Sequence, residues 1–98
     1  MALSKHGELR ARKRFGIPKK TAEKLAIEAW DQGHHIKVFT GYFKKFLMYQ
    51  ARTYRCVVRV HKGNLFFFDH EGILITCWPI PNQYRKNYKD RTEHVANS

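Results

Sequence analysis

The stretch Arg55-Cys56-Val57-Val58-Arg59-Val60-His61 marks the point where the chain changes from helical to alternating hydrophobic periodicity. The alternation predicts a strand with Cys56, Val58 and Val60 on one face and the residues between them on the other. A turn at 62–64, a strand at 65–68, a turn at 69–72 and a strand at 73–78 are predicted to follow. We therefore expect a three-stranded antiparallel meander.

Helical periodicity precedes the strands. Its clearest instance is a set of apolar residues three and four positions apart: Ala22, Leu25, Ala26, Ala29 and Trp30. This spacing predicts an amphipathic core helix that ends at Gly33. A first helix is expected from the N-cap Ser4 to Phe15, because Gly16 and Pro18 would stop it there.

A third helix is expected over residues 41–53, and a strand that begins at Tyr42 is the alternative. Residues 1–82 would then form a single α+β domain. Two or three N-terminal helices are expected to pack on one face of a small antiparallel sheet of three to four strands. Residues 83–98 are polar and basic, which predicts a loosely ordered C-terminal tail.

The chain is strongly basic, with 19 Lys and Arg against 8 Asp and Glu and a net charge of +11. Such a surplus favours association with nucleic acid or another anionic surface. No stretch is long and apolar enough to span a membrane, and the charged N-terminus lacks the apolar core of a signal peptide. We expect a cytoplasmic protein without membrane contact.

Several kinds of site are absent from the sequence. No two of the six histidines have the i, i+4 spacing that presents both to one metal ion, and no Gly-rich phosphate loop occurs. We expect neither a metal nor another cofactor. Cys56 and Cys77 fall in strand patterns, which predicts buried thiols rather than a disulfide or a nucleophile.

The first helix carries the strongest chemical pattern. His6, Arg10, Lys13 and Arg14 stand at i, i+4, i+7 and i+8, so they share one side of the helix. An imidazole titrates near neutral pH and guanidinium groups clamp phosphate in a bidentate manner. This inventory suits metal-independent acid/base cleavage of RNA. The alternative is an exposed helix start followed by a solvated cationic face.

A hydroxyl in the third strand is a second candidate. The alternation predicts that Leu74, Thr76 and Trp78 share one face of that strand. Thr76 would either satisfy its hydroxyl on the backbone or aim it into a basic groove, where it could orient a phosphate oxygen.

Two motifs together resemble the small toxin-type ribonucleases of the barnase/EndoU/colicin/RelE-like superfamily: His6-x-x-x-Arg10-x-x-x-Arg14-Phe15-Gly16-Ile17, and later Phe66-Phe67-Phe68-Asp69-His70-Glu71-Gly72-Ile73-Leu74-Ile75-Thr76. The resemblance implies helices packed on an antiparallel sheet and metal-independent RNA cleavage. It implies His6 as the acid/base, Arg10 as the phosphate clamp and Thr76 as the hydroxyl contact. The aromatic and basic segment 34–54 departs from this pattern.

Further nucleic-acid contacts are expected from basic and aromatic side chains: Arg12, Lys13, Arg14, Arg55, Arg59, His61 and Tyr84. Arg59 and His61 qualify if their strand face is the one that bears Thr76. RNA or another nucleic acid is the expected partner. An antitoxin, an acidic protein partner and a homodimer are left open.

The leading hypothesis is a metal-independent endoribonuclease of toxin type, or an RNA-binding domain derived from such a nuclease; whether the protein is an enzyme is left open. The alternative is a non-catalytic basic phage protein with an anti-defence role. It would inhibit a host complex that handles nucleic acid by binding nucleic acid or an acidic protein groove.

Catalysis and binding differ in what they require of His6. A catalytic site requires His6, Arg10 and Thr76 to converge on one groove. It also predicts that His6→Ala abolishes RNA cleavage while affinity changes only a few-fold, since an acid/base group contributes roughly 10²–10⁴ in rate. Cleavage is measured by incubating labelled RNA with the protein in EDTA and examining the products for 2′,3′-cyclic phosphate ends. A binder leaves the RNA intact, and charge reversal at Arg10 or Arg14 then matters most.

Overall fold

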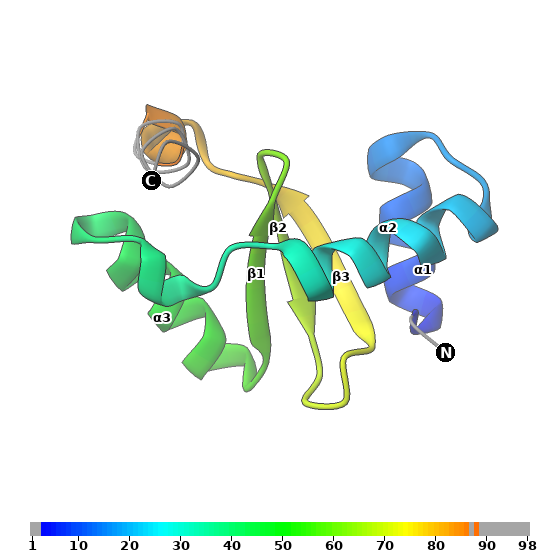
Figure 1. The fold of residues 1–98 in the computed structure, drawn as a ribbon, viewed down its shortest axis with the longest axis horizontal. Coiled ribbons are helices and arrows are strands. Elements are labelled where there is room, and N and C mark those ends of the chain that lie inside the picture. Colours follow the sequence, from blue (N-terminus) through cyan, green and yellow to red (C-terminus); the bar gives the residue numbers. More distant parts are fainter. Residues whose placement is uncertain (1–2, 87, 89–98) are drawn as a thin grey trace.

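The computed structural model describes residues 3–86 and 88, where three α-helices precede a three-stranded antiparallel sheet (Figure 1). The helices are α1 (Lys5–Phe15), α2 (Lys19–Gln32) and α3 (Gly41–Tyr54), with short 3-10 helices at Ile36–Val38 and Asn82–Tyr84. The strands are β1 (Val57–His61), β2 (Asn64–Phe68) and β3 (Leu74–Pro79), which lie in that order across the sheet. The α+β expectation is confirmed. None of the helices in this part of the chain has the length and apolar character needed to cross a membrane.

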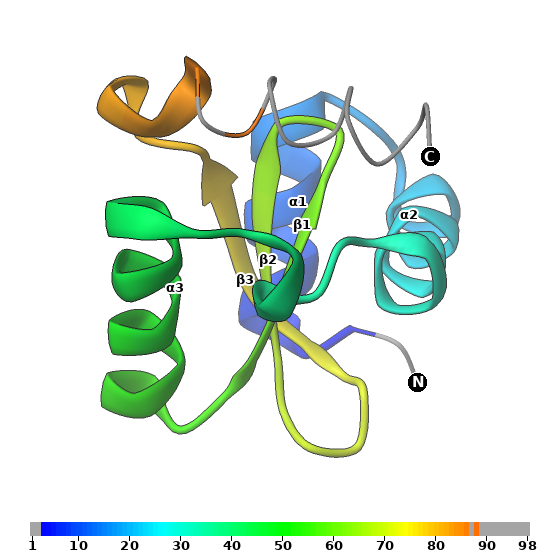
Figure 2. The same cartoon turned by 60° about the vertical axis from the view of Figure 1, so that its left-hand side comes forward.

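Helices cover both faces of the sheet rather than one. α1 and α2 pack over Phe66 and Phe68 of β2, whereas Phe43 of α3 packs with Leu65 and Phe67 on the opposite face. Figures 1 and 2 show α3 on one side of the sheet and the other two helices on the far side. The expectation of a single covered face is therefore wrong. Every residue of β2 is buried, so both faces of this strand need cover.

β3 contains a β-bulge. Its pairing with β2 shifts by one residue, which leaves Ile75 as the extra residue of the strand. The predicted alternation put Leu74, Thr76 and Trp78 on one face. Instead, Leu74 packs under α1 and α2, while Thr76 and Trp78 lie on the α3 side. That prediction is wrong because one inserted residue exchanges the faces of a strand.

α1 begins and ends where the sequence predicted. The Ser4 hydroxyl accepts a hydrogen bond from the Gly7 N–H at 2.9 Å, and Gly16 ends the helix in the left-handed region with φ of 64°. The Ser4 N–H and hydroxyl also donate to the Leu74 carbonyl, at 3.0 and 2.9 Å. The start of α1 is therefore fastened to β3.

Core packing continues past residue 82. The Tyr84 ring stacks on Phe43 and Phe46, with ring centroids 5.4 and 4.9 Å apart. The Tyr88 hydroxyl accepts a hydrogen bond from the Gly63 N–H at 3.1 Å. Both tyrosines thus pack on the domain, although the predicted tail was to begin at residue 83. Residues 87 and 89–98 of that tail lie outside the described residues.

Gly7 lets α1 approach β3 closely. A Cβ at this position would collide with the Leu74 carbonyl, whose carbon would lie 2.8 Å away. Alanine is the better helix former, yet we expect Gly7→Ala to lower the free energy of unfolding by about 1–3 kcal/mol, because the two backbones must separate. Urea unfolding followed by circular dichroism measures the change. Arg12→Ala, at an exposed position of α1, should change stability by less than about 0.5 kcal/mol. Unchanged stability of the Gly7 variant would contradict the close contact.

Candidate nucleic-acid interface

α1 presents a cationic surface whose side chains form no ion pair with the carboxylates of the described residues. We define the α1 basic surface as its exposed cationic side chains with the histidine near its start: Lys5, His6, Arg10, Arg12, Lys13 and Arg14. The ion pairs of the described residues join Glu8 to Lys19, and Glu28 to Lys62 and His61. None of them involves the α1 basic surface. Its positive charge is therefore available to an external anion.

Arg14 is the cation held most firmly in this surface. Its Nε donates to Asn64 Oδ1 at 3.0 Å, and its guanidinium carbon lies 5.8 Å from the centre of the Phe15 ring. Asn64 is buried and donates from its amide nitrogen to the Lys62 carbonyl at 3.0 Å. The terminal nitrogens of Arg14 have no hydrogen-bond partner among the described residues. They could bind a phosphate in a fixed orientation.

The helix dipole explains how α1 tolerates these cations. Arg12, Lys13 and Arg14 occupy the last turn, where positive charge interacts favourably with the helix C-terminus. This interaction offsets part of the repulsion between them. The basic spacing within the helix is consequently weak support for an anionic ligand. The lack of ion pairs between these cations and any carboxylate of the described residues, together with the net charge of +11, is the stronger support.

The α1–α2 junction extends the positive surface. Arg12 and Lys13 line a shallow hollow that ends at Pro18, the N-cap residue of α2. Pro18 supplies no capping side chain, and the first turn of α2 contains no acidic residue but begins with Lys19 and Lys20. The positive end of the α2 dipole adds to these charges.

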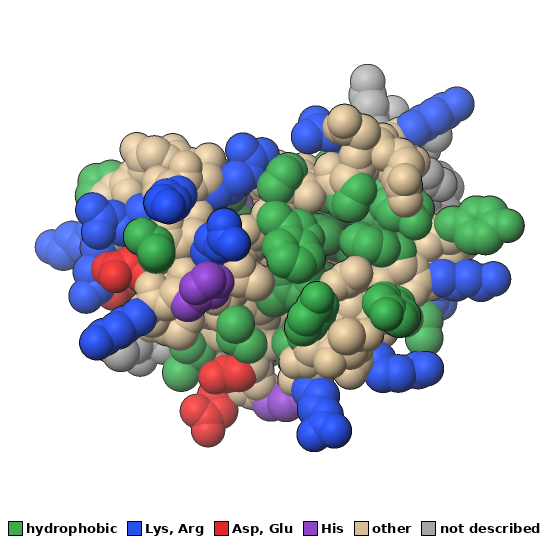
Figure 3. Space-filling model, turned by 180° about the vertical axis from the view of Figure 1, so that it is seen from behind, with side chains coloured by type: hydrophobic (Ala, Val, Ile, Leu, Met, Phe, Trp, Pro, Cys, Tyr) green, Lys and Arg blue, Asp and Glu red, His purple; other side chains and the backbone are tan. Residues whose placement is uncertain are grey.

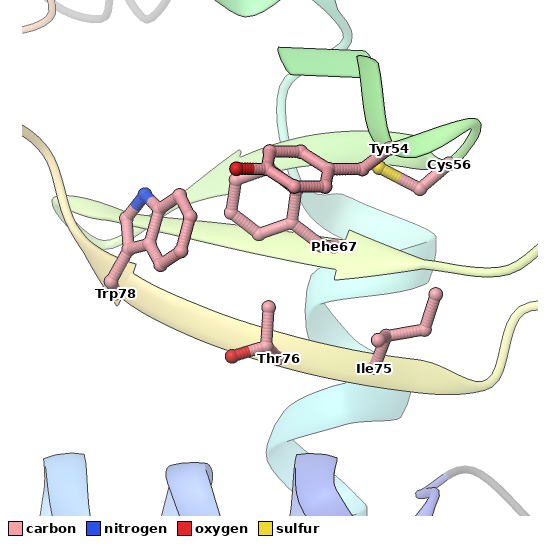
Figure 4. A pocket seen from close by; sticks show the side chains of 6 residues that line it. All are labelled: Tyr54, Cys56, Phe67, Ile75, Thr76 and Trp78. Atoms are coloured by element: carbon pink, nitrogen blue, oxygen red, sulfur yellow. The ribbon is translucent and has the colours of Figure 1, made fainter. Parts of the chain in front are cut away.

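Thr76 is separated from His6 and Arg10 by the sheet. Its side chain points toward Phe67, on the side of β3 away from α1 (Figure 4). The hollow that Thr76 lines contains no residue of α1, because α1 packs on the opposite face. The convergence of His6, Arg10 and Thr76 that catalysis requires is not found. The bulge in β3 accounts for the difference, since it sets the face to which Thr76 belongs.

Two expected nucleic-acid contacts serve the packing of α2 instead. The Arg59 guanidinium carbon lies 4.9 Å from the centre of the Trp30 ring, and the Arg59 Nη1 donates to the Val58 carbonyl at 3.3 Å. His61 is buried, with its Nε2 3.5 Å from a Glu28 carboxylate oxygen. Arg59 and His61 therefore lie on the face opposite Thr76. Tyr84, the third such side chain, packs on α3 as described above.

The histidines of the described segment do not assemble a metal site. No group of three or more His, Cys, Asp or Glu side chains there could hold a metal ion. His34 exchanges both of its backbone hydrogen bonds with Val60, at 2.7 and 3.0 Å, and so extends the edge of β1. Burial lowers the pKa of His34, and the neighbouring His61 lowers it further. The His61 ring lies near Glu28 of α2, whereas the His34 ring packs against Phe39 and Tyr88.

A hollow beside β3 is the feature that sequence reasoning missed. It encloses about 230 Å³ and is lined by Tyr54, Cys56, Phe67, Ile75, Thr76 and Trp78. Exposed apolar side chains border it, because Tyr54 is 60% exposed and Ile75 is 36% exposed. Arg55, one of the predicted contacts, is exposed beside it at the end of α3. The aromatic residues of α3 indicated an apolar surface in this region of the sequence. The bulge that completes the hollow has no recognisable sequence pattern.

Both cysteines are buried and protonated at neutral pH. Burial raises the pKa of the Cys77 thiol to about 11, although the nearby Arg14 and Arg10 act in the opposite direction. Burial also raises the pKa of Cys56. Because the thiolate is the nucleophile, neither residue is suited to catalysis at neutral pH.

We expect both thiols to resist iodoacetamide at pH 8 in the native protein and to react quickly in denaturant, because unfolding restores an ordinary pKa and access. Mass spectrometry of peptides after timed alkylation measures this for Cys56 and Cys77 separately. A free cysteine-containing peptide in the same tube is the control. Rapid native labelling of Cys77 would show that β3 separates from α1 in solution.

Comparison with known proteins identifies no relative. No protein-family model matches this chain, and no curated protein or solved structure is significantly similar to it. The resemblance to toxin-type ribonucleases therefore depends on its short motifs alone. The function must be argued from the arrangement of this chain's own residues.

Proposed function

We propose that this protein binds nucleic acid, with RNA as the expected ligand, through the α1 basic surface. One observation carries the proposal: six exposed Lys, Arg and His side chains lie on one helix, and no carboxylate in the described part of the chain pairs with them. Lys and Arg that neutralise phosphates release condensed counterions, which supplies most of the affinity of a sequence-tolerant binder.

The interface is well ordered for this role. α1 is fastened at its start through Ser4 and Leu74, and at its end through Arg14 and Asn64. The backbone of α1 thus keeps a fixed position along β3. Because the Arg14 guanidinium is already held by Asn64, it loses less side-chain entropy when it binds a phosphate.

The proposal is for binding without cleavage. Acid/base cleavage requires a base, a cation and a hydroxyl or other donor at one phosphate. His6 is exposed, and no described residue forms a hydrogen bond that would orient its ring. Thr76 lines a hollow on the other face of the sheet. This arrangement favours phosphate contacts over catalysis.

Charge reversal tests the proposed surface. We expect Arg10→Glu to weaken RNA binding roughly tenfold near 0.1 M salt, and to lower the slope of log affinity against log salt by about one, because one phosphate contact is lost. Lys37→Glu is the matched control: it changes the net charge equally at an exposed site outside α1 and should alter affinity by less than about twofold. Fluorescence anisotropy with labelled RNA measures both. Equal losses for the two variants would contradict a local interface.

The same preparations test for cleavage. We expect labelled RNA to remain intact during prolonged incubation in EDTA, with the unaltered protein and with His6→Ala alike. Denaturing gel electrophoresis shows whether the RNA is cut. Cleavage that produces 2′,3′-cyclic ends and disappears in His6→Ala would refute binding without cleavage and restore the ribonuclease hypothesis.

A further inference from the structure

We propose that the hollow beside β3 receives an unpaired base of a single-stranded nucleic acid whose phosphates lie on the α1 basic surface. The inference rests on the proposed function, because it specifies the kind of nucleic acid that the protein binds. Three properties of the hollow favour this occupant: its aromatic walls, its unpaired polar groups and the positive charges around it.

Aromatic rings form the walls and floor of the hollow. Figure 4 shows the Trp78 ring on one side of Phe67, with the Tyr54 ring overlapping Phe67 in this view. The Phe67 and Trp78 rings meet edge to face with centroids 4.7 Å apart, which fixes the Trp78 indole. Tyr54 is 60% exposed and can adjust to a ligand. Stacking on such rings is available to every base, whatever its sequence.

Three polar groups at the hollow have no partner within the described residues. The Tyr54 hydroxyl, the Thr76 hydroxyl and the Trp78 Nε1–H make no hydrogen bond there. Together they offer both donors and acceptors. An apolar side chain from a protein partner would leave these groups unpaired, which costs free energy. The polar edge of a base can pair with them while its ring covers the apolar lining.

Positive charge lies beside the hollow and across β3 from it. Arg55 follows Tyr54 and precedes Cys56, which both line the hollow, and it is exposed at the end of α3. On the opposite face of β3, α1 packs over Cys77, and the nearby Arg10 and Arg14 oppose the rise of the Cys77 pKa. Figure 3 shows hydrophobic side chains gathered between groups of Lys and Arg. A strand could therefore rest its phosphates on α1 and turn one base over β3.

The charges also distinguish among occupants. A second copy of the chain would bring a net charge of +11 against another +11, so self-association through this face is electrostatically unfavourable. A duplex satisfies the cations but keeps its bases stacked and paired, and extrusion of one base costs free energy. A single strand satisfies both the cations and the hollow without that cost.

Fluorine NMR of protein labelled with 5-fluorotryptophan tests the inference on the unaltered chain. Trp78 lines the hollow, whereas Trp30 packs against Phe68 and Arg59 on the other face of the sheet. Single-stranded RNA and DNA oligonucleotides should both shift the Trp78 resonance and leave that of Trp30 in place. A duplex of equal length should shift neither. Trp78→Phe assigns the two resonances.

Binding measurements with tyrosine variants give an independent readout. We expect Tyr54→Ala to weaken single-strand binding roughly five- to a hundredfold, the range for loss of one stacked base, and to change duplex binding by less than about twofold. Tyr49→Ala is the matched control. It lies on the same helix with 65% exposure against 60% for Tyr54, but it does not line the hollow. The affinity of the Tyr49→Ala variant for single strands should stay within about twofold of that of the unaltered protein.

The outcomes separate this inference from the proposed function. The protein could bind single strands while the Trp78 resonance stays in place and Tyr54→Ala has no effect. That result would overturn the proposal that a base enters the hollow, but not the proposal that α1 binds nucleic acid. Failure to bind any nucleic acid at low salt overturns both. A Trp78 resonance that moves with protein concentration alone assigns the hollow to a second copy. A Trp78 resonance that shifts when polyglutamate is added, but not when oligonucleotides are added, assigns the hollow to an acidic protein partner. Either result refutes the inference.

Discussion

Burial of β2 on both faces is the constraint on which the rest of the structure depends. Its four apolar residues, Leu65, Phe66, Phe67 and Phe68, alternate between the two faces, and all are at most 2% exposed. Burial of such side chains contributes about 1.5–3 kcal/mol each, so a chain of this size cannot leave either face open at its centre. α1 and α2 must cover one face, and α3 with the first residues after β3 must cover the other.

The cover on the two faces is unequal, and this inequality creates the candidate interface. On one side, α1 lies along β3, held through Ser4, Gly7 and Arg14. On the other side, α3 lies nearest β1, and its last residue Tyr54 leaves an opening above β3. A basic helix and an aromatic hollow thus come to border the same edge strand. They face opposite sides of the sheet, which suits a flexible strand better than a rigid duplex.

The bulge at Ile75 decides which chemistry this edge can support. Without it, Thr76 would share a face with Leu74, which packs beneath α1 and α2. With it, the Thr76 side chain lines the aromatic hollow instead, with its methyl group toward Phe67 (Figure 4). A single inserted residue therefore moves the only hydroxyl of β3 away from His6 and Arg10, and a potential catalytic group becomes a potential ligand contact.

The sequence by itself determined the local structure of this protein. The Ser4 cap, the Gly16 stop and the alternation around Val58 predicted helices and strands correctly, because capping, backbone freedom and side-chain period act within a few residues. The cationic character of α1 was equally plain. Only the tertiary structure decided that α3 crosses to the second face, that Arg59 and His61 pack against α2, and that Thr76 lies in a hollow. These outcomes depend on the bulge in β3 and on contacts between residues far apart in the chain, which no local pattern encodes.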